Sequence, residues 1–117
     1  MKVAFRVDSS IHLGSGHISR CTALATALRK RGAEVVFVCA ELAGNHSYIA
    51  RHAGFDVLTL SEGVPKSDAI RTAEALGTHV DCLVVDHYGL DQRWERAIRP
   101  WCERVLAIDD LANRPHD

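Results

Sequence analysis

This sequence lacks the cysteine and histidine spacings that are typical of metal sites and redox-active dithiols. It contains four cysteines and seven histidines, yet no CxxC, HxH or HxxxH pair occurs. Zinc sites and redox dithiols use such spacings, so we expect no metal and no cofactor. The four cysteines are far apart and each lies within an apolar pattern. They are therefore predicted to be buried free thiols in a reducing compartment, which favours a cytoplasmic location.

The sequence also lacks an excess of either charge and lacks long apolar runs. Its 14 basic and 15 acidic side chains give a formal net charge of −1. Such a balance does not attract nucleic acid or a membrane surface, so neither is expected as a partner. No run approaches the roughly 20 apolar residues of a membrane helix, and the first eight residues, MKVAFRVD, hold too short a run for a signal peptide. The 117 residues are 47% hydrophobic, which predicts one globular domain over residues 1–117.

Short apolar runs rich in β-branched residues alternate with amphipathic segments. Continuous runs of this kind are typical of strands buried on both faces, and they occupy residues 3–7, 35–38, 57–60, 82–85 and 105–108. Helices are predicted over residues 18–31, 45–52, 67–76 and 92–103. Trp94 and Trp101, seven apart on the last of these, are expected to face the core. The alternation predicts an α/β fold, a parallel sheet with helices on both faces.

A glycine turn follows the first strand. Gly14 and Gly16 let backbone N–H groups approach a phosphate or a sugar, and the amino end of the next helix adds partial positive charge. The turn therefore favours an anion. It is a poor dinucleotide fingerprint, because Ser19 stands where a third glycine belongs and no acidic residue ends the second strand. It also lacks the Gly-Lys-Ser/Thr ending of a phosphate-binding P-loop.

His17 stands in the first turn of the helix that follows. Helix amide dipoles disfavour a cationic ring there, and a neutral imidazole can accept a proton. We predict that His17 is the catalytic residue, since ligands of parallel sheets bind beyond the carboxyl ends of the strands. The alternative is that His17 caps the helix or packs beneath the turn. Asp8 could orient the imidazole, receive a ligand hydroxyl, or cap the turn itself.

Further polar residues lie at the same predicted edge. Arg6 interrupts an apolar strand and Arg20 lies three residues past His17 on the same helix face, so one of them is expected to meet a phosphate or a carboxylate. After the fourth strand come Asp86, His87 and Tyr88. Hydrogen bonding to a sugar suits these three better than a metal site.

The motifs resemble those of a known family. The segments RVDSS at 6–10 and GSGHISRC at 14–21 look like the amino-terminal signature of the UDP-2,4-diacetamido-2,4,6-trideoxy-β-L-altropyranose hydrolases of pseudaminic acid biosynthesis. The segments VVDHY at 84–88 and AIDDLANR at 107–114 resemble later motifs of that family. The resemblance covers essentially the whole chain. It implies a Rossmann-like amino-terminal half of a GT-B-like two-domain enzyme. The polar ending with Pro115 and no closing helix likewise led us to expect that a longer protein continues past it.

The resemblance also implies a reaction and roles for residues. UDP would be displaced from the anomeric carbon by water with inversion, with His17 as the general base and no divalent metal. The turn residues Gly14, Ser15 and Gly16 would approach the diphosphate or sugar. The remaining substrate-binding residues would be Arg6, Asp8, Arg20, Asp86 and Tyr88. A carboxyl-terminal nucleotide-binding domain would supply most contacts to UDP, so the chain alone is expected to bind UDP-sugar weakly and turn over slowly. An inverting glycosyltransferase domain and a non-catalytic nucleotide-sugar binding domain remain alternatives.

Overall fold

The computed structural model describes residues 1–9, 14–61, 67–86 and 92–108, and these form one sheet with helices around it. The strands are β1 (Lys2–Val7), β2 (Glu34–Ala40), β3 (Asp56–Leu60), β4 (Val80–Asp86) and β5 (Cys102–Ile108). The helices are α1 (Gly16–Lys30), α2 (Tyr48–His52), α3 (Asp68–Leu76) and α4 (Gln92–Ile98), and a 3-10 turn, η1 (Arg99–Trp101), precedes β5. The predicted strands and helices are confirmed in kind and order.

The sheet is parallel and has the strand order β3-β2-β1-β4-β5. The chain starts in the centre, moves outward through β2 and β3, and then returns to the other side of β1 for β4 and β5. The strand order therefore reverses between β1 and β4, which lie side by side with Val7 opposite Asp86. Connections leave two neighbouring strands in opposite directions at such a point, and ligands of open α/β sheets bind in the crevice that results. The prediction of a Rossmann-like α/β fold is confirmed for this domain.

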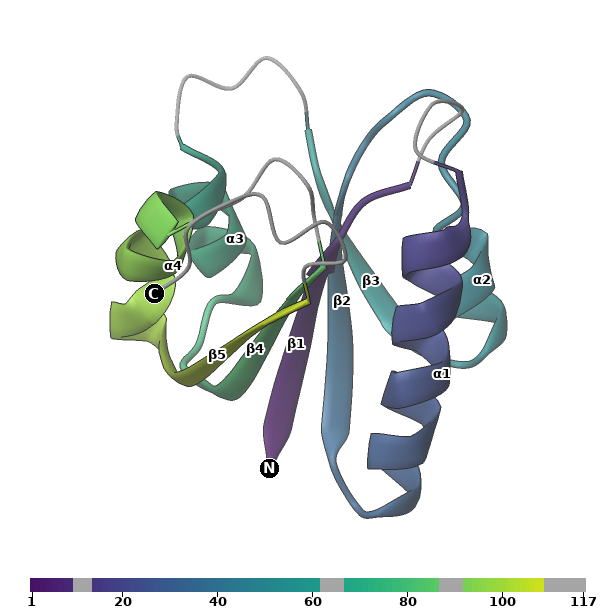
Figure 1. Ribbon diagram of the computed structural model, residues 1–117, viewed down its shortest axis with the longest axis horizontal. Helices are drawn as coiled ribbons and strands as arrows, with labels where there is room; N and C mark the ends of the chain where they lie inside the picture. Colours follow the sequence, from purple (N-terminus) through teal and green to yellow (C-terminus); the bar gives the residue numbers. More distant parts are fainter. Residues whose placement is uncertain (10–13, 62–66, 87–91, 109–117) are drawn as a thin grey trace.

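Helices cover both faces of the sheet, with α1 and α2 on one side and α3 and α4 on the other (Figure 1). Because side chains alternate along a strand, β1 contributes to both layers. Its Val3 and Phe5 pack beneath α1, where Phe5 stacks on Phe37 of β2 with ring centroids 5.1 Å apart. Its Ala4 packs in the layer beneath α3 and α4. Arg6 follows Ala4 on that second face, so a charged side chain stands inside an apolar layer.

The predicted end of the fourth helix, at residue 103, is wrong. Helix α4 stops at Ile98 and Pro100 lies in η1, so β5 begins at Cys102 where the helix was expected to continue to residue 103. Proline has no N–H for the helix ladder, and its ring clashes with the preceding turn. Trp94 is buried as predicted, but Trp101 falls in η1 and is 40% exposed.

The cysteines lie mostly in the interior. Cys21, Cys39 and Cys102 are buried, Cys82 is half-buried, and all four are free thiols, as the sequence predicts. Within the part of the chain that the structure describes, no helix has the length and apolar character needed to cross a membrane.

Candidate functional site

The glycine turn opens onto the start of α1. Gly14 has a φ of +74°, a left-handed conformation in which a side chain is strained. A Cβ atom built on Gly14 or Gly16 would meet no described atom within 4 Å, so these residues leave room beside the backbone. Ser15 is the N-cap residue, yet its side chain makes no capping hydrogen bond. The geometry of the turn is compatible with the predicted approach of a ligand to its backbone.

His17 lies in the first turn of α1 and faces β4. Its Nδ1 is 2.5 Å from Oδ1 of Asp86, the last residue of β4. His17 is 8% exposed and Asp86 is 1% exposed, so the contact is shielded from water. Ser15, not His17, occupies the capping position of the helix, so the structure does not support the capping alternative for His17. The reversal of strand order thus brings the first-helix histidine and the last residue of β4 together.

Arg20 and Cys21 hold the same carboxylate from the next turn of α1. Arg20 Nε donates to Asp86 Oδ2 at 3.1 Å, and Nη2 lies 2.9 Å from Oδ1 and 2.8 Å from Oδ2. Cys21 Sγ lies 3.5 Å from Oδ2. Residues three and four positions after His17 share its helix face, which explains the spacing. Asp86 is therefore bound by three side chains of a single helix face.

The hydrogen-bond chemistry fixes the imidazole tautomer. An ionised carboxylate only accepts hydrogen bonds, so Nδ1 of His17 donates its proton to Asp86, and in the neutral ring Nε2 is the nitrogen that carries the lone pair. Arg20 Nη2 also lies 3.3 Å from Nδ1, but a guanidinium only donates. The shorter contact to Asp86 therefore assigns the proton to Nδ1. The guanidinium of Arg20 acts on the ring only as a neighbouring positive charge. This arrangement suits an imidazole that accepts a proton at Nε2.

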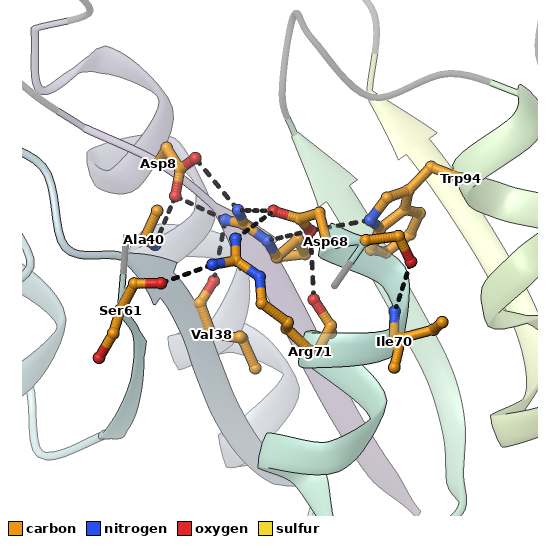
Figure 2. A network of polar contacts seen from close by, with 11 residues as sticks. Asp8, Val38, Ala40, Ser61, Asp68, Ile70, Arg71 and Trp94 are labelled. Atoms are coloured by element: carbon orange, nitrogen blue, oxygen red, sulfur yellow. Dashed lines mark hydrogen bonds and ion pairs between the residues drawn. The ribbon is translucent and has the colours of Figure 1, made fainter. Parts of the chain in front are cut away.

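A second cluster lies on the opposite face of the sheet, around the guanidinium of Arg6. All five N–H groups of Arg6 have protein acceptors. Nε and Nη2 donate to Asp68 at 3.0 and 2.6 Å, Nη1 and Nη2 donate to Asp8 at 2.5 and 3.2 Å, and Nη1 lies 3.4 Å from the carbonyl oxygen of Val38. Figure 2 shows Asp8, Asp68 and Trp94 converging on this cluster from three elements. Arg6 is 1% exposed.

The Arg6 cluster links the ends of several elements. Asp8 Oδ1 accepts a hydrogen bond from the backbone N–H of Ala40 at 2.7 Å, which ties the end of β1 to the end of β2. Asp68, the first residue of α3, accepts from Trp94 Nε1 of α4 at 2.8 Å. The cluster therefore fixes where α3 and α4 begin relative to the central strand.

The charges of this cluster act on one another. Burial by itself raises the pKa of Asp68, but the hydrogen bond and charge of Arg6, together with Trp94, leave that pKa below its ordinary value. Burial lowers the pKa of Arg6, and hydrogen bonds to Asp68 and Asp8 outweigh it, so the net direction is upward. Both groups are accordingly charged at neutral pH.

Arg6 meets carboxylates, as was expected of Arg6 or Arg20, but they belong to the protein's own Asp8 and Asp68. The substrate-binding roles of Arg6 and Asp8 stay predictions. Every N–H group of Arg6 is directed at a protein acceptor, which leaves no donor for a phosphate. The carboxylate beside the imidazole belongs to Asp86, whereas Asp8 contacts Arg6, so the suggestion that Asp8 orients His17 is wrong. Asp86 was expected to bind a sugar, and in the structure both of its oxygens face residues of α1.

No local pattern predicts the contacts of Asp68, Trp94 and Cys21. Asp68 is an acid in the first turn of its helix, where a carboxylate is common because it favours the helix amino end. The pairing of His17 with Asp86 had a usable signal, because first and fourth strands of this fold type are neighbours at the reversal of strand order. That rule, applied to the two motifs, would have matched the histidine with the aspartate.

Two of the predicted features lie outside the described residues. These are the pair His87 and Tyr88, which were expected to hydrogen-bond a sugar, and residues 109–114 of the motif at 107–114. Among the residues that the structure does describe, no three His, Cys, Asp or Glu side chains gather in a way that would hold a metal ion.

The thiols near the site are poor nucleophiles. Burial raises the pKa of Cys21 well above its ordinary value, and the neighbouring Asp86 carboxylate adds to the effect. Burial also raises the pKa of Cys39, to about 12. Both side chains stay protonated at neutral pH, so Cys21 acts as a weak hydrogen-bond donor to Asp86.

A cavity of about 700 Å³ lies at the other end of the sheet. Lys2, Arg29, Glu34 and Phe55 are among the residues that line it, near the amino ends of β1, β2 and β3. None of the predicted site residues borders it. We place the candidate site at the carboxyl edge of the sheet, because both polar clusters and the reversal of strand order lie there. The cavity at the amino ends of the strands has only a rim of mixed charge.

These features define a Rossmann-like domain with a buried histidine–aspartate pair where the strand order reverses. No known protein-family profile matches the chain. The chain is similar to the UDP-2,4-diacetamido-2,4,6-trideoxy-beta-L-altropyranose hydrolase of Campylobacter jejuni, with 32% identity over 118 residues that cover 99% of the chain and 39% of that protein. It is also similar to an uncharacterized protein of Methanocaldococcus jannaschii, with 24% identity over 110 residues, or 94% of the chain and 22% of that protein. The chain thus spans well under half the length of either relative.

Proposed function

We propose that this chain is the water-activating part of a UDP-sugar hydrolase. The observation that carries the proposal is the buried contact of His17 with Asp86 at the reversal of strand order, 2.5 Å between Nδ1 and Oδ1. A carboxylate that holds one tautomer of a histidine and stabilises its protonated form is a common way to make a general base. The similarity to the Campylobacter hydrolase supplies the reaction class and the proposed substrate, a UDP-linked 2,4-diacetamido-2,4,6-trideoxyhexose.

In this mechanism His17 Nε2 accepts a proton from a water molecule. The water oxygen attacks the anomeric carbon on the face opposite UDP, and the bond from that carbon to the diphosphate oxygen breaks with its electron pair leaving on UDP. The configuration at the anomeric carbon inverts. Asp86 stabilises the imidazolium that forms, and the backbone N–H groups of the 14–16 turn are proposed to stand against the diphosphate or sugar.

A chimera tests this function. This chain replaces the aligned 39% of the Campylobacter hydrolase, and release of UDP and free sugar is followed by NMR. We expect turnover with inversion, and we expect His17→Asn to lower kcat by roughly 10²- to 10⁴-fold, the usual contribution of a general base. Lys30→Gln, a charge change on the exposed end of the same helix, serves as the matched control and leaves kcat unchanged.

Two results would count against the hydrolase. One is a chimera whose turnover is the same with Asn at position 17. The other is an inactive chimera together with no shift in the amide resonances of residues 14–17 when UDP-sugar is added to the 117-residue chain. Formation of a glycoside in place of free sugar would show that an acceptor hydroxyl, not water, is deprotonated.

A non-catalytic nucleotide-sugar binding domain is the second candidate. The low exposure of His17, 8%, favours it, because a histidine–aspartate contact inside a helix–sheet interface also stabilises a fold. In that case His17→Asn lowers the free energy of unfolding and leaves turnover of the chimera intact. The two candidates therefore predict opposite results for one variant.

A further inference from the structure

Arg20 differs from the other members of the His17 cluster in its exposure. Its side chain is 40% exposed, whereas Asp86, whose two oxygens it holds, is 1% exposed. The guanidinium thus lies between a buried carboxylate and the surface of α1. Because a guanidinium is planar and presents several fixed N–H groups, it can hold both oxygens of one carboxylate in a single orientation.

The orientation of Asp86 sets the orientation of the imidazole. Oδ1 accepts from His17 Nδ1, and both Oδ1 and Oδ2 lie within 3.1 Å of Arg20 nitrogens. A rotation of the carboxylate would therefore break the hydrogen bonds of Arg20 together with the contact to the ring. Cys21 donates to Oδ2 only weakly, since a thiol is a poor donor, so it cannot replace that grip.

Charge gives Arg20 a second effect on His17. Asp86 alone would present a full negative charge to the ring from inside the protein. With Arg20 attached, the described groups that face the ring from α1 and β4 are a carboxylate and a guanidinium whose charges offset each other. This offset limits how strongly the carboxylate acts on the ring that, in the proposed function, takes a proton from water.

We propose that Arg20 is a positioning residue that acts on His17 through Asp86, by locking the carboxylate and offsetting its charge. The proposal rests on the function proposed above, where His17 is the general base, and it assigns Arg20 a role other than contact with substrate. It predicts that the protonation pattern of the His17 ring depends on the identity of residue 20.

Ring-nitrogen NMR of the 117-residue chain tests the proposal without any substrate. At pH 8, where an ordinary histidine is neutral, the unsubstituted chain is expected to show one tautomer with the proton on Nδ1, favoured roughly tenfold or more over the other. Arg20→Gln is expected to lose that preference and to give a doubly protonated ring or mixed tautomers. Arg20→Lys keeps the charge but not the two-oxygen grip, so we expect a neutral ring with mixed tautomers.

Lys30→Gln on the exposed end of α1 is the matched control and leaves the ring spectrum unchanged. A single Nδ1–H tautomer in Arg20→Gln would overturn the proposal. Should Arg20→Gln fail to fold, Arg20→Lys replaces it, and a single Nδ1–H tautomer in that variant would likewise overturn the proposal. A ring that responds to residue 20, in a chain whose chimera is inactive and whose 14–17 amide resonances do not shift with UDP-sugar, would support the positioning role and contradict the proposed function.

Discussion

Two arginine–carboxylate clusters lie on opposite faces of the sheet at its carboxyl edge. They differ in the exposure of the arginine and in the groups that share its carboxylate partners. In the cluster beneath α3 and α4, Arg6 is 1% exposed and donates all five N–H groups to protein acceptors. In the cluster beneath α1, Arg20 is 40% exposed and its carboxylate partner also binds an imidazole.

The difference matches the roles proposed above, in which the Arg6 cluster holds the fold and the Arg20 cluster positions the proposed general base. The Arg6 cluster joins β1, β2, α3 and α4 and has no group that changes its protonation near neutral pH. The Arg20 cluster contains the imidazole of His17, the side chain proposed above as the general base. Breaking the first cluster should therefore lower the free energy of unfolding, while breaking the second should alter the histidine with a smaller loss of stability. Three predictions test this contrast, from the largest expected effect to the smallest.

Arg6→Met is expected to have the largest effect. It removes the guanidinium that pairs with the carboxylates of Asp8 and Asp68 and leaves Asp68 with the more distant Arg71, whose Nη2 lies 3.7 Å away. Removal of one partner of a buried ion pair costs about 3–5 kcal/mol. Urea unfolding followed by circular dichroism measures the change in the free energy of unfolding. Lys30→Gln is the surface control, expected within about 0.5 kcal/mol of the unsubstituted chain. A loss below about 1 kcal/mol for Arg6→Met would remove the contrast.

Acid should weaken the Arg6 cluster through Asp68. The folded-state pKa of Asp68 is below the ordinary value of 3.8, so the stability it contributes is fully present above that value and is lost as pH falls through the folded pKa. At pH 7 we expect Asp68→Asn to be less stable than the unsubstituted chain by about 1.5–3 kcal/mol, the range for hydrogen bonds to a charged group. The measurement is urea unfolding of both proteins from pH 7 to pH 2.5. A gap between them that does not narrow below about pH 4 would contradict this account.

Trp94→Phe should have the smallest effect of the three. It removes the Nε1–H donor to Asp68 Oδ1, a contact of 2.8 Å, but leaves Arg6 and Thr72 as donors to the same oxygen. We expect a loss of about 1 kcal/mol in the free energy of unfolding. The ring-nitrogen spectrum of His17 should stay as it is, because Trp94 lies on the other face of the sheet. A changed His17 spectrum would show that the two clusters are coupled through β1 and β4.

Local sequence patterns predicted most of the fold and part of the site. Runs of β-branched residues identified the strands because both faces of a parallel strand are apolar, and the position of His17 after two glycines placed it at the edge where ligands bind. The end of α4 was missed because the amphipathic pattern runs on to residue 103 while Pro100 ends the helix earlier. The partners of Arg6 were missed because Asp68 is 62 residues away in sequence, and no local pattern connects them.

The sequence by itself determined the α/β alternation, the buried thiols and the presence of a histidine at the start of the first helix, since each depends on the spacing of neighbouring residues. Only the tertiary structure decided which carboxylate meets which cation. Asp86 is the last residue of β4, opposite Val7, and Asp8 follows Val7 at the end of β1. Successive side chains point to opposite faces, so Asp8 joins Arg6 beneath α3, whereas Asp86 joins His17 and Arg20 beneath α1. The pairing of each carboxylate with its cation follows from the strand order and from the face of the sheet to which each side chain points. Both are set only when the whole sheet assembles.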